Sequence, residues 1–583
     1  MGSGSEGDRR PKVICLLACA MLLAWPACGA AAPVVYPLDD FDDGNLQNDG
    51  FGPSGKWEDG GSAVRETFPA PGSDGMGRRL RLEWRLVPGT AGAGWWMRPA
   101  PRGTRDMREF AALRLSVRGE GFSEGEALRL KLADRTQAVE IDLAAPTTEW
   151  SLVEAPFDRF AGVDLSAVQE VALALSPGDE PTEGALEVDE LQLVSRESAP
   201  ADDEALLELI GRRTFRYFVE CADAETGLVA DAASNLRRSS IAAVGCSLAA
   251  MPIGIERGWI GAEDGEAHVL RALRTLHGRA AYAGFYHHFL DGATGGPWPE
   301  PGNEISTIDT AILVTGALRA REHFGPDSAI GRLAEELYEG VDWPAALDPE
   351  RRRFYHILPP PAAGARASTW DYYTDETLLI CRLAVESPTH PVSADVTSAW
   401  RQEVGEYGDS GPVVQSWFGS LFTYFIASLW VDTQGLHDPI TGVDWWENAR
   451  RAALANRQFC LDHASEYETY SRGWGLTACL GPRGYGGDFG ALPAGAGRAD
   501  HDGTVAPCAA AMSLPVFRDP GAPNYALDAL HGYFGTKLWG LYGFRDGFNL
   551  GPAAGGPADD WYAHDYIGLN QGLTLLGLRN PGT

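Results

Sequence analysis

The chain has 583 residues, a hydrophobic content of 44% and a formal net charge of −32, from 48 basic and 80 acidic side chains. This length and composition suit more than one buried core, and they exclude a disordered chain or one built mainly of membrane spans. The strong negative charge argues against nucleic acid or another polyanion as a partner. A neutral ligand fits the charge better.

The N-terminal residues 1–32 have the three parts of a secretory signal: basic residues between Arg9 and Lys12, an apolar run over 13–25, and small residues up to Ala32. This layout predicts export to the periplasm or the extracellular space. Cleavage near Ala30 is one interpretation, and a lipoprotein modified at Cys28 is another. A membrane anchor is a third reading, for which the apolar run is short.

Residues 33–196 consist of short segments in which apolar and polar residues alternate, separated by turns. The clearest segments lie at 79–84, 112–117, 127–134 and 185–193. Alternation of period two at this density predicts an antiparallel β-sandwich. The acidic segment 38–44 makes calcium conceivable there, although surface acids are the commoner explanation, and we predict no metal site and no cofactor.

The order of landmarks in this region resembles the jelly-roll carbohydrate-binding modules. They are LDDFDDG at 38–44, Gly-Trp-Trp at 94–96, LSVRG at 115–119, WSLVEAPF at 150–157 and a closing VDELQL. The tryptophans are at least as well explained as core residues, so we assign no sugar platform among them.

A polar linker at 197–205 separates the sandwich from a second domain at 206–583, in which long helical patterns replace the alternation. The eleven predicted helices cover 204–222, 239–254, 265–279, 306–323, 330–340, 374–385, 415–430, 445–463, 504–514, 526–534 and 567–578. Eleven is close to the twelve helices of an all-α (α/α)6 barrel, which we expect here. Six cysteines beyond the signal are widely spaced and predict buried free thiols, although a disulfide stays possible.

The segment 284–316 is the most informative stretch for function. An aromatic run that contains His288 leads into a Gly- and Pro-rich loop with Trp298 and Glu304. An apolar helix follows, with Ser306 at the N-cap position and Asp309 three residues later. The pattern predicts that an acid and an indole lie at the N-terminal end of a buried helix, where ligand sites tend to be built.

Many motifs in this domain resemble, in order, the bacterial glucoamylase-like domain. They lie at 239–260 (SSIAAVGCSLAAMPIGIERGWI), 284–291 (GFYHHFLD), 304–318 (EISTIDTAILVTGAL), 386–391 (ESPTHP), 429–438 (LWVDTQGLHD), 445–450 (WWENAR), 474–485 (WGLTACLGPRGY), 502–515 (DGTVAPCAAAMSLP) and 538–549 (LWGLYGFRDGFN). That group resembles the β-1,2-glucanases of glycoside hydrolase family 144 and the cyclising domain of cyclic β-1,2-glucan synthases. The resemblance covers about 215–580 and implies an (α/α)6 barrel, with a neutral β-glucan or oligosaccharide as ligand.

Glycoside cleavage needs one carboxylic acid to protonate the leaving oxygen and a second carboxylate to activate water or attack carbon. We expect Glu304 to be the acid and Glu376 the second carboxylate, because both stand at predicted helix starts. Glu376 is equally well explained as an ordinary first-turn acid. Secondary catalytic candidates are Asp309, Asp371, Glu447 and Asp565.

A sugar site also needs flat rings and hydrogen-bonding groups. The predicted substrate-binding residues are Trp298, His288, Trp370, Tyr373, Trp417, Trp446 and Asn570. Some of these rings pack the barrel instead, and the sequence does not separate the two groups.

Two departures from the family pattern keep other functions open. Residues 424–428 are mostly apolar where family members have polar residues, and Asn570 replaces an aspartate. An amide can orient water but cannot take its proton. The alternatives to a β-1,2-glucan hydrolase are therefore a glycan-binding protein on a barrel without catalysis, and a β-glucan transglycosylase. The sequence leaves the oligomeric state open.

Overall fold

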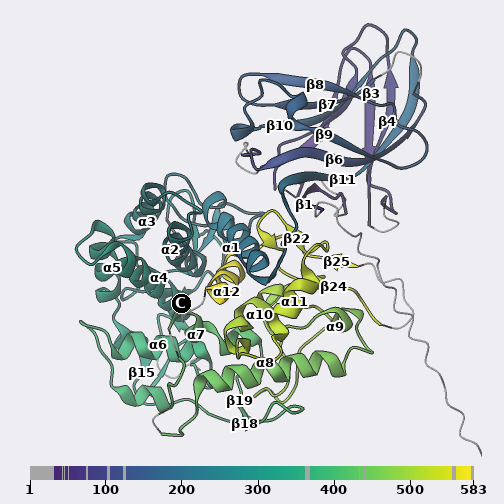
Figure 1. Ribbon diagram of the computed structural model, residues 1–583. Coiled ribbons are helices and arrows are strands. Elements are labelled where there is room, and N and C mark those ends of the chain that lie inside the picture. Colours follow the sequence, from purple (N-terminus) through teal and green to yellow (C-terminus); the bar gives the residue numbers. More distant parts are fainter. Residues whose placement is uncertain are drawn as a thin grey trace, which may run out of the picture.

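The computed structural model describes residues 32–42, 44, 46–49, 51–73, 77–100, 105–122, 127–360, 368–431, 433–438, 440–553 and 560–579. Strands occupy the N-terminal part of the chain and helices dominate the rest, as expected (Figure 1). The expected signal peptide and Cys28 lie outside the described residues. No helix in the described ranges is both long and apolar enough to cross a bilayer.

Two antiparallel sheets form the N-terminal domain. One has the order β3-β4-β11-β6-β9, with β1 paired to β11, and the other has the order β2-β5-β10-β7-β8. Along β4, four apolar residues from Leu80 to Leu86 are buried and the residues between them are more exposed, because one face of the strand lies in the core. The strands are β1 Pro33–Asp39, β2 Ser54–Glu58, β3 Ala63–Thr67, β4 Leu80–Leu86, β5 Ala93–Met97, β6 Phe110–Glu120, β7 Ala127–Ala133, β8 Ala138–Leu143, β9 Ser151–Pro156, β10 Glu170–Ser176 and β11 Thr182–Ser198.

The second domain contains twelve α-helices within the described residues. They are α1 Asp203–Glu220, α2 Ile241–Glu256, α3 Ala262–Leu276, α4 Thr307–Phe324, α5 Ala329–Glu339, α6 Asp375–Val385, α7 Ile426–Trp430, α8 Trp445–Asp462, α9 Glu468–Arg472, α10 Pro507–Ser513, α11 Tyr525–Tyr533 and α12 Gly568–Leu578. Two-stranded ladders join the loops between them: β12 Arg238–Ser240 with β13 Phe289–Asp291, β14 Ile305–Ser306 with β17 Ile357–Leu358, β15 Leu347–Asp348 with β16 Arg353–Phe354, β18 Val404–Gly405 with β19 Val413–Val414, β20 Cys479–Gly481 with β21 Gly484–Gly486, β22 Trp539–Gly540 with β23 Gly543–Phe544, and β24 Phe548–Asn549 with β25 Trp561–Tyr562.

Helices α2 and α4 pack against each other at the centre of this domain. All residues of α2 from Ile241 to Gly254 are buried, so this helix has no solvent face. Gly245 and Gly316 bring the two backbones together, because a Cβ at Gly316 would lie 2.0 Å from the carbonyl oxygen of Gly245. The packing continues from α4 to α6, α7 and α12 and returns to α2, with α3 and α5 on the outside. The full regularity of an (α/α)6 barrel stays a prediction.

The segment 415–430 differs from the continuous helix that its pattern predicts. Only α7 is α-helical, after a 3₁₀ turn at Leu421–Tyr424. Gly419 has a φ of +66°, and a Cβ there would lie 1.9 Å from the carbonyl oxygen of Ala491. The chain makes a left-handed turn packed against another segment, which a helix cannot contain. The predicted helix is therefore wrong before residue 421.

All six cysteines of the described residues are buried and free, which confirms the expected buried thiols. Burial raises the pKa of these groups, for example to about 12 at Cys246 and Cys460. The thiols therefore behave as small apolar core groups.

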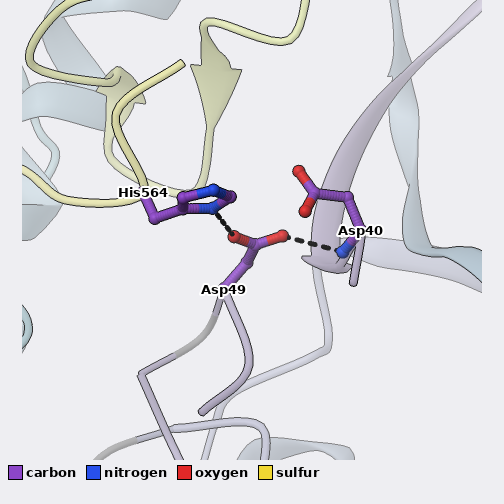
Figure 2. Close-up of side chains that lie close together, drawn as sticks. All are labelled: Asp40, Asp49 and His564. Atoms are coloured by element: carbon purple, nitrogen blue, oxygen red, sulfur yellow. Dashed lines mark hydrogen bonds and ion pairs between the residues drawn. The ribbon is translucent and has the colours of Figure 1, made fainter. Parts of the chain in front are cut away.

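Charged side chains join the sheet domain to the helical domain. The Arg545 guanidinium lies 3.3 Å from Asp40 and 3.0 Å from Asp49. His564 lies 3.5 Å from Asp49 (Figure 2). Burial opposes ionisation of Asp49, but the charge of Arg545 and the hydrogen bond with His564 hold the pKa of Asp49 below its ordinary value. Asp40 belongs to the segment considered for calcium, and Arg545 balances its charge here.

A second contact strengthens the same interface. Arg213 of α1 is 1% exposed, donates to the Tyr36 hydroxyl at 3.0 Å and pairs with Glu109 at 2.9 Å. Nearby, Arg105 pairs with Glu220 at 3.2 Å. Because these buried charges have their partners in the other domain, the two domains are held in one fixed arrangement.

We expect Arg545→Met to lower the free energy of unfolding by about 3–5 kcal/mol, because it leaves two largely buried carboxylates without their cation. Urea denaturation measures the change. The matched control is Arg498→Met, which removes an arginine that is 73% exposed and pairs with Asp500, and for which we expect at most about 1 kcal/mol. Equal changes in the free energy of unfolding of the two variants would show that the ion pairs of Arg545 do not stabilise the protein more than a surface ion pair does.

Candidate active site

Two neighbouring helix starts place the expected acids. Ser306 caps α4 by accepting a hydrogen bond from the Asp309 backbone N–H at 3.3 Å, and Glu304 stands just before this cap. Thr374 and Thr377 form a reciprocal capping box at the start of α6, with Glu376 in its first turn. Helix α4 packs on α6, and the charge of Asp309 acts both on Glu376 and on His288, the partner of Glu304, so both acids lie in the region around Asp309.

His288 lies between two carboxylates of this region. Its Nδ1 is 3.3 Å from Glu304 Oε1, and its Nε2 is 3.7 Å from Asp309 Oδ1. The backbone fixes this position, because the His288 N–H donates to the Glu304 carbonyl at 2.8 Å. Phe289 stacks on the imidazole at 3.8 Å, and the Arg238 guanidinium lies 3.7 Å over the Phe289 ring.

The protonation of His288 follows from these neighbours. Burial alone would lower its pKa, but the charge of Asp309 and the hydrogen bond to Glu304 raise it to about 9. The imidazole is therefore positively charged at neutral pH. In return, its hydrogen bond holds the pKa of Glu304 below the ordinary value, so Glu304 is an anion.

Glu376 has the opposite environment. Burial, and then the negative charge of Asp309, raise the pKa of Glu376 to about 8. The Thr374 hydroxyl, which favours the anion, does not offset them. Glu376 therefore carries a proton at neutral pH, while Glu304 does not. These protonation states are the reverse of those that the expected roles require, because a helix start alone does not reveal the His288 contact or the burial of Glu376. Which glutamate donates the proton stays a prediction.

Three further acids, Asp231, Asp546 and Asp565, lie near this region, since the charges of His288 and Asp309 act on Asp231. Asp565 accepts hydrogen bonds from Ser234 and from the Tyr566 N–H, and Asp546 accepts from the Leu480 N–H at 2.6 Å. Burial raises the pKa of Asp231 and Asp565, and it raises that of Asp546 to about 7. The negative charge of Asp565 raises the pKa of both Asp231 and Asp546, and that of Asp231 raises the pKa of Asp546, so the three acids share one electrostatic environment.

Several expected site residues lie elsewhere or are engaged. Asp371 pairs with Arg353 at 2.8 Å, and Glu447 pairs with Arg450 and Arg451 at 2.7 and 2.8 Å. These ion pairs account for both acids without a catalytic role.

Two substrate-binding predictions are corrected by burial. Tyr373 is 0% exposed, stacks on Trp445 at 4.7 Å and donates to Asp375, so its ring packs the core and cannot hold a sugar. Asn570 is 5% exposed and donates to Asp546 at 2.8 Å, so its amide is buried and engaged with that acid. Sequence alone could not show this, because a buried and an exposed ring at a helix start have the same pattern.

The remaining predicted rings keep exposed surface. Trp370 is half-buried and donates to the Thr307 hydroxyl at 3.2 Å, which places it beside the start of α4. Trp298 and Trp446 are also half-buried, and Trp417 is 42% exposed. The backbone N–H of Trp298 donates to the Phe289 carbonyl, so its loop lies next to the imidazole stack.

Sequence analysis missed Asp231, Asp546 and Tyr485. Tyr485 lies on β21, presents 54% of its surface and is close to the Asp546 and Asp231 carboxyls. A ring exposed beside buried acids is suited to pack on a sugar. The sequence could have indicated Asp546 and Tyr485, because both lie within motifs of the family resemblance. Asp231 lies in none of these motifs.

Residues 367–583 match a family model described as "Glycoamylase: Putative glucoamylase". The expected resemblance to the glucoamylase-like domains is confirmed. Glu376 falls inside the matched range and Glu304 before it.

A curated relative, an exo β-1,2-glucooligosaccharide sophorohydrolase of Parabacteroides distasonis, is 28% identical over 444 residues. The alignment covers 68% of this chain and 57% of the relative, so the chain spans little more than half of that protein's length.

Solved structures show a further likeness. A Bacteroides uniformis protein named a "putative glucoamylase" is 26% identical with a TM-score of 0.56, over 65% of this chain and 92% of that one. A β-1,2-glucanase from Parabacteroides distasonis is 19% identical with a TM-score of 0.58, over 94% of this chain and 96% of that one. The second likeness shows that the fold of nearly the whole chain, sheet domain included, is shared.

We expect the His288 imidazole to titrate near pH 9 in NMR spectra of the full chain. Asp309→Asn should lower its pKa by about 1 unit or more, because a neighbouring carboxylate favours the imidazolium. His268 provides an internal control: burial lowers its pKa to about 4, and it should not respond. Titration of His288 near the ordinary value of 6.5 would contradict the bridging geometry.

Proposed function

We propose that this protein is a glycoside hydrolase that cleaves a β-linked glucan, with β-1,2-glucan as the substrate. The observation that carries the proposal is the pair of acids around Asp309: Glu304 is ionised beside His288, and Glu376 is protonated by burial. Two carboxyl groups of unlike protonation at one site are what glycoside cleavage requires. The names of the relatives support the substrate.

In the proposed reaction, the Glu376 carboxylic acid donates its proton to the glycosidic oxygen as the bond to the sugar carbon breaks. The Glu304 carboxylate acts on the other side, as the base for water or as the nucleophile. His288 keeps Glu304 ionised through its positive charge. Asp309 supports both states, because its negative charge raises the pKa of His288 and that of Glu376.

The rings that keep exposed surface would hold the sugar. Trp370 and Trp298 lie beside the start of α4, and Tyr485 lies close to Asp231 and Asp546. The C–H faces of glucose pack on such rings while hydroxyl groups bond to acids such as Asp231 and Asp565. We include in the proposal an (α/α)6 barrel, supported by the closed helix packing, and export, supported by the pattern of residues 1–32.

Release of reducing ends from linear β-1,2-glucan tests the activity. We expect Glu376→Gln and Glu304→Gln each to lower kcat/KM by at least about a hundredfold, since acid–base groups contribute about 10²–10⁴-fold. The control Glu447→Gln removes an acid paired with two arginines, and it should keep activity close to that of the unchanged protein.

Three other outcomes would each overturn part of the proposal. Binding of β-glucans without any release would indicate a glycan-binding protein. Redistribution of chain lengths without new reducing ends would indicate a transglycosylase. Release only from a glucan of another linkage would keep the hydrolase and replace the substrate.

The pH dependence of kcat/KM should separate the two acids. Activity should fall as the pH rises through about 8, because Glu376 loses the proton it must donate. At the acid end it should persist below the ordinary glutamate pKa of 4.5, because His288 keeps Glu304 ionised. In Asp309→Asn the alkaline limb should move to lower pH, since one cause of the raised pKa is gone. If the alkaline limb stays at the same pH in Asp309→Asn, the loss of activity at high pH belongs to a group other than Glu376.

A further inference from the structure

A cavity of about 330 Å³ lies between α6, α7, the loop that follows α7, and the start of α8. This volume is within the range of about 300–1,000 Å³ that is typical of small-molecule sites. Leucine, valine, alanine and tryptophan side chains from these segments form most of its wall. The proposed function gives this cavity no role.

The cavity lies on the face of α6 that points away from the candidate active site. The α6 residues that line it recur with the i, i+3, i+4 and i+7 spacing of one helix face: Leu378, Cys381, Arg382 and Val385. With a rotation of about 100° per residue, Glu376 stands on the opposite side of the helix. The two sites therefore share a helix but not a surface.

The Thr433 hydroxyl is the polar group that distinguishes this cavity from an ordinary packing gap. Thr433 lines the cavity and is 6% exposed, and its Oγ1 has no hydrogen-bond partner among the described residues. A buried hydroxyl without a partner costs free energy, which a hydrogen-bonding ligand would recover. Because a threonine hydroxyl can donate or accept, a hydroxyl or a carbonyl group of a ligand would satisfy it.

The rim of the cavity favours an uncharged ligand. Arg382 lies 3.4 Å from Glu386, and the Asp438 carboxylate accepts hydrogen bonds from two backbone N–H groups. Since these charges already have partners, an ionic ligand would lose its hydration among apolar side chains without gaining a counter-charge. At the mouth, Leu436 lines the cavity and is 47% exposed, which offers an apolar surface to an entering molecule.

We propose that this cavity binds a small, uncharged and mostly apolar molecule that carries one hydroxyl or carbonyl group. Its apolar body packs against α6 and Trp445, and its polar group forms a hydrogen bond with Thr433 Oγ1. Apolar cavities of about 150 Å³ hold a benzene ring, so this one has room for two fused rings.

Such a ligand would touch the residues that fix the first turn of α6. Ala427 lines the cavity, and its backbone N–H donates to Asp375 at 3.2 Å. Trp445 also lines the cavity and stacks on Tyr373, which donates to the same carboxylate. The ligand therefore fastens α6, α7 and α8 to one another, and its binding should raise the melting temperature of the protein.

Ligand-observed NMR titration of the full chain with 1-naphthol and with naphthalene tests the site. The two probes have nearly the same shape, but only 1-naphthol can form a hydrogen bond with Thr433. We expect 1-naphthol to bind about tenfold more tightly, a difference of about 1.4 kcal/mol. Thr433→Val replaces the hydroxyl with a methyl group of similar size. It should remove this difference and leave the binding of naphthalene unchanged.

A second variant tests the apolar mouth without disturbing the core. Leu436→Ser should weaken the binding of both probes by about fivefold, because it removes apolar surface that they would cover. Since Leu436 is partly exposed, this variant remains informative even if Thr433→Val perturbs folding. The matched control is Leu461→Ser on α8. Leu461 is 45% exposed and lies outside the cavity lining, so both dissociation constants should stay the same.

Several results would overturn this site. Equal affinities of the two probes for the unchanged protein would contradict the hydrogen bond to Thr433 and, with it, the class of ligand. Binding of neither probe, or binding that Leu436→Ser leaves unchanged, would exclude the cavity. Displacement of 1-naphthol by linear β-1,2-glucan would place the probe in the candidate active site. A dimer that Leu436→Ser dissociates would assign this surface to a second copy of the chain. None of these measurements requires hydrolysis, so they stand apart from the test of the proposed function.

Discussion

The contact of one imidazole with two carboxylates determines the chemistry available at the centre of the helical domain. His288 is held by the Glu304 backbone, covered by Phe289 and placed between Glu304 and Asp309. Without its positive charge, these acids and Glu376 would repel one another and take up protons together. With it, one acid stays ionised and another stays protonated at the same pH, which is the asymmetry that acid–base catalysis needs.

Helix starts bring these acids together, but their surroundings give them different roles. Asp375 and Glu376 are neighbours in the first turn of α6. Asp375 turns inward, where it accepts from Tyr373, from two backbone N–H groups of α7 and from the Ser428 hydroxyl. It thereby fixes α6 against α7, and Glu376 is left with only the Thr374 hydroxyl to favour its anion. The structural acid Asp375 and the proposed catalytic acid Glu376 are adjacent because the first turn of α6 faces both the core and the centre of the domain.

Local sequence signals predicted what local structure determines. The caps at Ser306 and Thr374 located both helix starts, and alternation located the strands of the sandwich. The same signals failed where contacts between segments far apart in the sequence determine the structure. Tyr373 looks like a platform ring until Trp445 is seen to cover it, and Asp231 joins the site only when the ring of helices closes. The turn at Gly419 depends on a carbonyl about seventy residues away in the chain, which no periodicity can encode.

The departures from the family pattern acquire a physical meaning in this structure. Residues 424–428 are at most 6% exposed, so their apolar character serves the packing of α7 rather than the binding of a sugar. Asn570 replaces an acid, yet it donates to Asp546, whose pKa burial raises to about 7. An aspartate at position 570 would place a second negative charge against Asp546, whereas the amide lets Asp546 ionise near neutral pH. This wall therefore keeps an acid with a pKa of about 7, and the amide of Asn570 serves as its hydrogen-bond donor.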